Sequence, residues 1–339
     1  MPVQRGEDII IGVGLEDPSN RGTKVAPQVF IPGRVPTKLA VVMNKKLVKE
    51  TRGSKLASAG SEAVMKHAAG DLEFNLRVKS IPYILKSLLG KLESAPKDGD
   101  AAVGVHTATV LPENPQHPAL TAAVHQPQLT DYSYPLALIS ALGIKLVPDD
   151  LVVATVGIIA KDEVAEDDAF EPTFDENDVY FRHQDVTIKI AENAASLDAG
   201  DTLLVKELTL NLANGARVDQ NVSEFNPGNV IATTMSPTGS FKLDMDDEEL
   251  RDVYVGGENR AIRITMVRSD ITIGSASHPK ITITLPVCTI EKWSPDRPID
   301  EVVRQGIDFT VHANPDGEPV TIVVENDQAD YLSAAEEES

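Results

Sequence analysis

Two stretches of the chain, about half its length apart, repeat one order of apolar and polar positions. In each stretch a glycine is followed by three apolar residues that alternate with polar ones. The alternating positions are Leu72, Phe74 and Leu76 in the first stretch, and Phe241, Leu243 and Met245 in the second. Apolar residues at every second position predict a β-strand with one buried face.

Matching elements flank both alternating strands. Each is preceded by another apolar strand, an Asn turn and a long polar loop that ends at Gly70 or Gly239, and each is followed by a short helix and a glycine. The predicted flanking elements are the strands Leu39–Met43 and Leu208–Leu212, the turns Asn44-Lys45 and Asn214-Gly215, and the helices Tyr83–Leu89 and Glu249–Val255. A repeat of this length exceeds the periods of solenoid proteins and indicates a duplicated domain.

Further alternating runs make each half mostly β-structure. Residues Val152–Ile159 are apolar at nearly every position, which predicts a strand covered on both faces. Residues 262–266 and 281–285 predict half-buried antiparallel strands, and Pro298–Gln305 predicts one more short helix. A hairpin turning at Pro148-Asp149 ends the first half, and one at Pro315-Asp316 ends the second. The predicted fold is α+β and mainly β: two tandem antiparallel β-sandwich domains, each flanked by a short helix.

Composition shifts along the chain set the predicted boundaries. The first residues are rich in Pro and Gly, which favours an extended arm, and the stretch between the halves holds nine carboxylates, which favours a solvated linker. The predicted segments are an N-terminal arm (1–37), a first domain (38–161), an acidic linker (162–180), a second domain (181–330) and a flexible acidic tail (331–339).

The charge balance limits the class of partner. The 339 residues include 31 Lys plus Arg against 52 Asp plus Glu, for a formal net charge of −21. Such a surface repels nucleic acid and does not adhere to an anionic membrane. The chain has one cysteine, Cys288, so it forms no intrachain disulfide. Without a secretory signal or an apolar run long enough to span a bilayer, we expect a soluble protein used inside a cell.

Candidate chemistry is sparse. Gly12-Val13-Gly14 lacks the third glycine and the helix of a dinucleotide loop. The carboxylates from Asp244 to Glu249 lack the spacing of a calcium loop and suit a charged first helical turn. No two histidines are spaced as in a zinc protease helix, no serine stands in a Gly-x-Ser-x-Gly elbow, and mid-strand Cys288 fits a buried thiol. We therefore predict no catalytic residue, no cofactor and no metal site.

A basic loop stands out in this acidic chain. Between Lys45 and His67 there are six Lys or Arg residues and only two Glu. A solvated loop is one interpretation. The other is that the loop contacts an acidic surface on a neighbouring copy, with apolar residues buried alongside, because surface ion pairs alone contribute little. The candidate contact residues are Lys45, Lys46, Leu47, Lys49, Arg52, Lys55, Leu56, Val64, Met65 and Lys66.

The order of arm, strand, Asn turn, long loop, Gly-led strand, helix and hairpin resembles the tail tube proteins of long-tailed (siphovirus-like) bacteriophages, in a duplicated-domain form. The resemblance runs from roughly Ile9 to Asn326. The segments that carry it are Asn44-Lys45-Lys46, Thr51–Ser54 and Gly70-Asp71-Leu72 in the first half, and Asn211–Gly215, Pro237–Phe241, Glu249-Leu250 and Val320–Asn326 in the second.

The resemblance implies a structural protein of the virion tail, assembled in the host cytoplasm. Its sandwich domains would stand side by side so that their inner sheets close into a β-barrel tube. A duplicated chain would form trimeric, pseudo-hexameric rings, with a hexamer as the alternative, and the arm and long loop would bridge stacked rings. Implied partners are further copies of the chain, a tape-measure protein, tail terminator and tip proteins, and double-stranded DNA passing through without specific binding.

Two expectations complete the reading. A channel for DNA should be acidic, with basic residues turned outward or paired, because each phosphate contact adds affinity and friction. The alternative function is a monomeric two-domain β-sandwich adhesin or binding module, although the 4% aromatic content argues against a sugar-binding platform. An enzyme is the weakest option.

Overall fold

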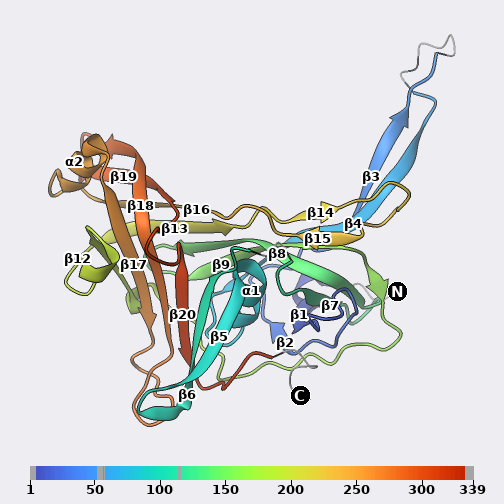
Figure 1. Cartoon of the computed structure of the whole chain (residues 1–339), viewed down its shortest axis with the longest axis horizontal. Coiled ribbons are helices and arrows are strands. Elements are labelled where there is room, and N and C mark those ends of the chain that lie inside the picture. The colour runs from blue at the N-terminus through green and yellow to red at the C-terminus, as the bar shows by residue number, and fades with distance from the viewer. Residues whose placement is uncertain (1–4, 52–55, 57, 114–115, 333–339) are drawn as a thin grey trace.

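The computed structural model describes residues 5–51, 56, 58–113 and 116–332, and antiparallel strands make up most of it (Figure 1). This confirms the predicted mainly β, α+β class. The helical elements of the described residues are α1 (Ile81–Leu89), α2 (Glu249–Gly256) and the 3-10 turns η1 (Gly6–Asp8), η2 (His183–Asp185) and η3 (Ala194–Ser196). None of the helices within these described ranges is long and apolar enough to cross a bilayer.

One continuous antiparallel sheet, called here the long sheet, runs through both halves of the chain. Its eight strands, in spatial order, are β3 (Ala40–Val48), β4 (Gly60–Asn75), β9 (Val153–Ala160), β8 (Tyr132–Leu146), β13 (Val205–Ala213), β16 (Ser236–Asp244), β19 (Arg304–Val311) and β18 (Lys280–Asp296). The pairing of β8 with β13 joins the four strands of the first half to the four of the second.

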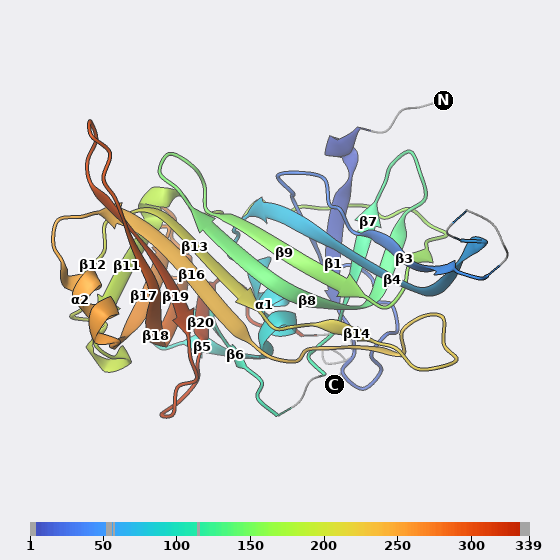
Figure 2. The ribbon, with the colours of Figure 1, turned by 90° about the horizontal axis from the view of Figure 1, so that it is seen from above.

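The two faces of the long sheet differ sharply. On β13, Leu208, Leu210 and Leu212 are buried, whereas the intervening Thr209 and Asn211 are partly or fully exposed. Because side chains alternate between faces, one face carries the core and the other is open. Figure 2 looks onto the open face, and α1 lies behind the sheet.

A second sheet covers the buried face. Its strands, in order, are β5 (Gly90–Lys97), β6 (Asp100–Val110), β20 (Thr321–Asn326), β18, β17 (Asn259–Val267), β11 (Val186–Ala191) and β12 (Asp201–Thr202). The 17-residue β18 belongs to both sheets, because its first residues pair with β17 and β20 and its last with β19. Apolar residues of both sheets and of α1 form one core.

Helix α1 is largely enclosed by this core, with every residue except Lys86 buried. It begins with a proline in its first turn, where the missing N–H costs no hydrogen bond, and it ends at Gly90 with a φ of 93°. The helix therefore stops at the predicted glycine and starts two residues before the predicted Tyr83, and its length is fixed by its own residues.

Two hairpins, one in each half of the chain, share the same geometry. The pair Lys145–Val153 of β8–β9 matches the pair Asp296–Arg304 of β18–β19, 151 positions later in each strand. The same shift places the β8 bulge after Ile139 on the β18 bulge after Ile290. The predicted equivalence of Pro148-Asp149 with Pro315-Asp316 is therefore wrong, because Pro315 lies between β19 and β20. The helix predicted at Pro298–Gln305 is also absent: residues 297–303 form a turn and β19 follows.

The N-terminal residues are not a free arm in this structure. Strand β1 (Ile10–Leu15) pairs with β2 (Val29–Ile31) on one side and with β7 (Leu120–His125) on the other, and this small sheet continues through the start of β8 to β10 (Val164–Ala165). Ile11, Val13 and Leu15 are at most 2% exposed. The proline and glycine content of this segment predicted an arm, but the segment contains a strand whose apolar residues complete the core.

The linker and the tail also pack more closely than their charge predicted. Asp178 is buried, and its carboxylate accepts hydrogen bonds from the Lys79 N–H (2.7 Å) and the Ser80 hydroxyl at the start of α1. At the other end of the chain Tyr331 is 1% exposed, and its hydroxyl accepts a hydrogen bond from Asn326 (2.7 Å). Pairing with the body makes burial of these polar groups possible. The tail from residue 333 onward lies outside the described residues.

Candidate functional site: an open sheet face, two free edges and a basic hairpin

Most of the open face of the long sheet is built from small and polar side chains, although the loop that carries Val218 and Val230 covers it at Leu138 and Ile159. The strand pairings place these residues in rows across the sheet, one of which runs through Thr155, Gly143, Asn211 and Thr238 to Thr310. No aromatic residue occupies these positions, so the face offers no platform on which a base or sugar could stack. The result is a polar surface, which has a hollow of about 300 Å³ around Asn211 and Thr238.

Charges on the open face are mostly paired. On β4 from Asp71 onward and on the strands other than β3, the ionisable residues of the open face are Asp71, Glu73, Lys145, Glu207, Lys242, Asp244, Lys292, Asp296, Arg304 and Asp308. Six are acids and four are bases, which leaves a small acidic excess. Three of the bases contact carboxylates: Lys242 pairs with Glu207 (2.7 Å), Lys292 with Asp308 (3.8 Å) and Arg304 with Asp244 (3.5 Å).

The Lys242–Glu207 pair shows the local electrostatics. The hydrogen bond from Lys242 lowers the pKa of the Glu207 carboxyl below its ordinary value, so this acid stays ionised at neutral pH. Both side chains remain substantially exposed to solvent, so the pair contributes little to stability. Its effect is to neutralise a lysine that would otherwise attract phosphate.

Both ends of the long sheet have strand edges without a partner among the described residues. Strand β3 pairs only with β4, and residues 290–296 of β18 pair only with β19. Exposed edges of this kind are templates for pairing with another chain. The two edges correspond to the strands that join inside the chain: β18 matches β8 by the hairpin geometry above, and β3 opens its half as β13 opens the other, each with nine residues.

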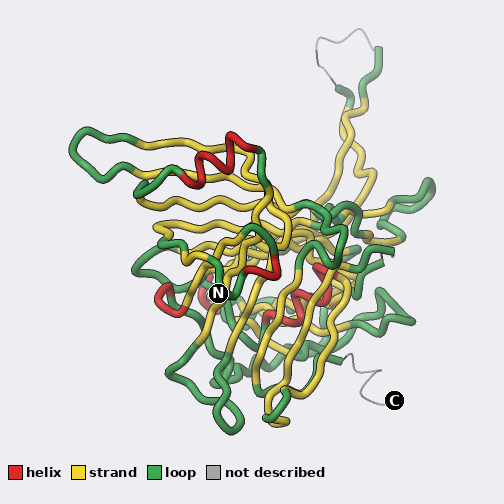
Figure 3. Tube along the Cα trace, turned by 60° about the vertical axis from the view of Figure 1, so that its left-hand side comes forward, coloured by secondary structure: helices red, strands yellow, loops and turns green. Residues whose placement is uncertain are grey.

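The predicted basic loop is largely a hairpin. Strand β3 continues through the expected Asn44 turn to Val48, with a bulge between Asn44 and Lys45, and β4 already begins at Gly60. Figures 1 and 3 show this hairpin projecting from the body. The sequence missed these strands because both faces of the hairpin meet solvent, so no apolar alternation marks them.

The structure separates the ten candidate contact residues into groups. Leu47 and Leu56 are 59% and 81% exposed, and Val64 is 45% exposed, so the hairpin does present apolar side chains to solvent. Lys45 and Lys46 lie on β3, Lys49 follows it, and Met65 is half-buried on β4. Arg52 and Lys55 lie outside the described residues.

Lys66 differs from the other candidates because its own chain already engages it. Its ammonium group pairs with Asp162 of the linker at 2.8 Å, and its backbone N–H donates to the carbonyl of Phe225 at 3.1 Å. Lys66 therefore marks the base of the hairpin, where the second half touches the first.

The long loop of the second half follows a different path. Its short strands β14 (Arg217–Asp219) and β15 (Asn229–Ile231) lie along the first half, and Val230 is fully buried with Leu136 and Leu138. Arg21 donates to the Val230 carbonyl (3.2 Å) and Asn226 to Asp162 (2.6 Å). Sequence reasoning did not identify this contact, although Val218 and Val230 were its signal in an otherwise polar loop.

The remaining candidate chemistry has structural roles. The Asp247 carboxylate accepts the Glu249 N–H (3.0 Å) at the start of α2, as a charged first turn predicts. His106 is buried and bonded to Ser94 (2.9 Å), and burial raises the pKa of the Cys288 thiol to about 12. The described residues contain no group of three or more His, Cys, Asp or Glu residues that could hold a metal ion.

Comparison with known proteins identifies a family for this chain. No curated protein matches the chain. A family model described as phage tail tube protein matches residues 45–322, which include all but the first five residues of the long sheet.

Proposed function

The chain belongs to the phage tail tube protein family, a family of structural virion proteins that assemble into the tail tube, and from this premise we propose that three copies close into a ring and that rings stack into the tube. In this proposal residues 38–161 and 181–330 act as two tail-tube-like domains, so that a ring of three chains holds six domains. The matched hairpins with their shared bulge support that assignment.

The observation that carries the proposal is the pairing of β8 with β13. Inside the chain, the last strand of one four-strand unit pairs with the first strand of the next, from Leu146–Leu208 to Ala141–Ala213. If the last strand of one chain paired in the same way with the first strand of the next chain, β18 of one copy would pair with β3 of its neighbour. Edge pairing of this kind removes both free edges of every copy.

Closure of three long sheets would give a barrel of twenty-four strands. With strands about 4.8 Å apart and tilted by about 40°, such a barrel is roughly 50 Å across. Small barrels are filled by their own side chains, whereas barrels of this size enclose water. The buried face must point into the core of each chain, so the open face would line the channel.

The chemistry of the open face suits a conduit for DNA. Its side chains are small, its charge is slightly acidic, and three of its four bases already contact carboxylates. A duplex would meet few unpaired cations, so passage would involve little binding and little friction. The net charge of −21 per chain adds repulsion between channel wall and phosphate.

We assign the contact between rings to the basic hairpin, through the exposed Leu47, Leu56 and Val64 with the lysines around them. An apolar and basic projection fits an acidic body with a hydrophobic recess on the next ring. Assembly in the host cytoplasm around a tape-measure protein, and capping by tail terminator and tip proteins, complete the proposed function.

Electron microscopy of the purified protein tests this function. We expect tubes of stacked rings, each with three chains, in averages computed without imposed symmetry. Six whole chains around the axis would contradict the trimer and leave the tube intact. Isolated particles at every concentration and salt condition would contradict the assembly itself.

A further inference from the structure

A short turn occurs twice in the chain, in front of a strand of each half. Arg5 donates two hydrogen bonds to the Asp8 carboxylate (2.9 and 3.2 Å), and β1 follows. Arg182 donates the same two bonds to Asp185 (2.8 and 3.0 Å), and β11 follows. Each Arg precedes its Asp by three residues and stands 177 positions from its counterpart, so the residues before Arg5 match those before Arg182.

The residues before Arg182 close one end of the first half. The Phe181 N–H donates to the Leu76 carbonyl (3.3 Å), and its carbonyl accepts from the Val152 N–H (2.9 Å). One residue pair further, the Val179 carbonyl accepts from the Val78 N–H (3.0 Å). The Phe181 side chain is fully buried. The linker thus adds a short strand to the end of the first half.

The matching end of the second half is uncovered. Met245 bonds to the Val303 carbonyl (2.9 Å) as Leu76 does to Val152 (2.8 Å). The groups that would match the Phe181 and Val179 contacts are the Val303 N–H, the Met245 carbonyl and the Asp247 N–H. None of these three has a hydrogen-bond partner within the part of the chain that the structure describes.

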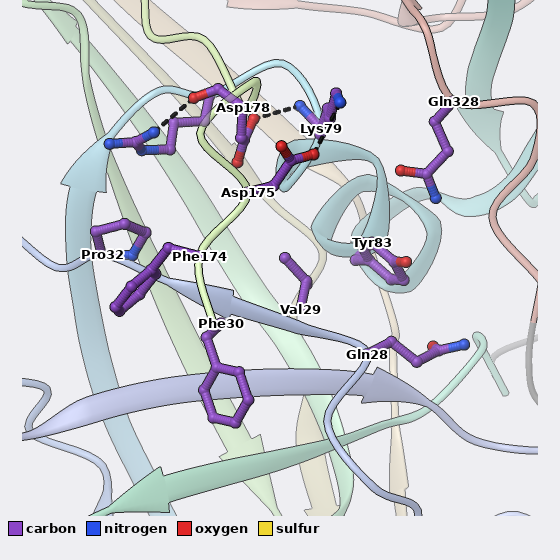
Figure 4. A pocket seen from close by; sticks show the side chains of 11 residues that line it. Gln28, Val29, Phe30, Pro32, Lys79, Tyr83, Phe174, Asp175, Asp178 and Gln328 are labelled. Atoms are coloured by element: carbon purple, nitrogen blue, oxygen red, sulfur yellow. Dashed lines mark hydrogen bonds and ion pairs between the residues drawn. The ribbon is translucent and has the colours of Figure 1, made fainter. Parts of the chain in front are cut away.

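Cavities at the two ends reflect this difference. At the first half, Phe174, Asp175 and Asp178 of the linker fill the space beside Arg77 and leave a pocket of about 110 Å³ (Figure 4). At the second half, a hollow of about 590 Å³ lies at the start of α2, lined by residues that include Leu243, Asp246 and Leu250.

The first turns of α1 and α2 differ in charge, and each suits the charge of the segment that packs, or would pack, against it. Helix α1 has no acid in its first turn and takes the carboxylate of Asp178 from the linker. Helix α2 supplies its own acids, Glu249 and Asp252, and the position that matches Asp178 is Met1, whose side chain carries no charge. A segment that carried its own carboxylate there would be repelled by α2.

We propose that the segment before Arg5 of one copy adds a short strand to the uncovered end of the second half of its neighbour in the same ring. Main-chain hydrogen bonds to an exposed edge would hold it, as the linker holds the first half. In Figure 1 the N-terminus and the uncovered end near α2 lie on opposite sides of the molecule, so a ring brings them together. The proposal rests on the ring proposed above.

Cysteine cross-linking tests it. Arg77 and Tyr180 form an isolated antiparallel bridge in the first half, and the matching pair between copies is Asp246 with Val3. Directly paired residues in antiparallel strands lie within disulfide range. The variant Val3→Cys/Asp246→Cys should give disulfide-linked species of at most three chains when assembled tubes are oxidised. Native Cys288 is buried and does not interfere.

Two control variants frame the result. Arg77→Cys/Tyr180→Cys should link within one chain and shows that the bridge geometry permits a disulfide. Val3→Cys/Asp252→Cys, with its second cysteine on the exposed side of α2, should not link. Deletion of residues 1–4 should raise the concentration needed for assembly by about tenfold to a hundredfold, the effect of losing a few backbone hydrogen bonds.

The outcomes separate this inference from the ring itself. Tubes without the Val3–Asp246 link would overturn the inference and leave the ring standing. Linked ladders longer than three chains would place the segment between rings, which also overturns it. Absence of tubes from the unmodified protein would remove the ring on which the inference rests.

Discussion

Tyr331 shows how single residues hold the end of this chain in place. Its ring packs edge-on against Tyr83 and His106, with centroids 4.9 and 4.7 Å away, and its backbone carbonyl accepts a hydrogen bond from Lys86 of α1 (2.9 Å). Its sequence neighbours are acidic and polar, so composition predicted a loose tail. One aromatic side chain outweighs that composition, because its burial stabilises by more than ordering a few residues costs.

Replacement of Tyr331 tests this anchor. Tyr331→Ala should lower the free energy of unfolding of the unassembled chain by about 3–5 kcal/mol, as for other large buried aromatics. Tyr331→Phe should cost about 1 kcal/mol, because only the hydrogen bond with Asn326 is lost. Urea denaturation measures both. Equal stability of Tyr331→Ala and the unmodified chain would show that the tail is not anchored here.

At the scale of elements, the sequence predicted several of the strands that have one buried face and one solvent-exposed face. The alternation of Leu72 and Phe74 and of Phe241 and Leu243 correctly placed the end of β4 and most of β16, but not the first ten residues of β4, and helix α1 followed from its own start and stop signals. The pattern failed for β3 beyond Asn44, for β1 and for β19. The period of two is hidden in β3 because both of its faces meet solvent, and in β1 by its glycines. In β19 it is hidden because the turn before the strand was predicted as a helix.

The same reasoning explains what could be predicted of the candidate site. The excess of Lys and Arg over Glu in one segment of an otherwise acidic chain identified the basic hairpin. Its exposed Leu47 and Leu56 were named from the sequence. The open face was not predicted residue by residue, because alternation alone does not say which polar face meets solvent outside and which lines an enclosed surface. The structure adds which face of the long sheet carries the core, and the proposal that the other face lines a channel follows from that.

The hairpin prediction is specific to its apolar residues. Leu47→Asp/Leu56→Asp should leave the fold and the melting temperature unchanged, because both side chains are exposed, and should prevent rings from stacking. Val222→Asp is the matched control, because Val222 is 96% exposed on the long loop of the other half. Size-exclusion chromatography and microscopy report the assembly state. Normal tubes from the double variant would refute the assignment of the hairpin.

At the scale of the whole molecule, the long loops of the two halves take different paths, which the proposed duplication would permit. The long loop of the second half folds onto the first half, whereas the hairpin of the first half projects into solvent. Six identical domains could not divide these tasks. A chain of two domains can use one loop to fix its own halves and keep the other for contact with neighbours.

The open face gives a prediction for assembled tubes. Thr155→Lys/Asn211→Lys places two unpaired cations per chain on the open face, where both residues are exposed. These tubes should bind duplex DNA in a salt-dependent way, while unmodified tubes should not. Ala195→Lys/Ala199→Lys adds the same charge at exposed positions beside η3, outside the open face.

Fluorescence anisotropy of a labelled duplex at several salt concentrations measures the difference. Similar binding by both lysine variants would mean that added charge, wherever it lies, accounts for the effect. No binding by Thr155→Lys/Asn211→Lys would contradict the assignment of the open face to the channel.

The pairing of β8 with β13 has a mechanical consequence. In the proposed ring of three chains, half of the domain boundaries would be crossed by a covalent backbone and would not separate without unfolding a chain. A tube bent or pulled during infection would therefore rupture along the three boundaries between chains. Such a wall fails by separating into intact two-domain units, and each unit keeps its core closed and ready to reassemble.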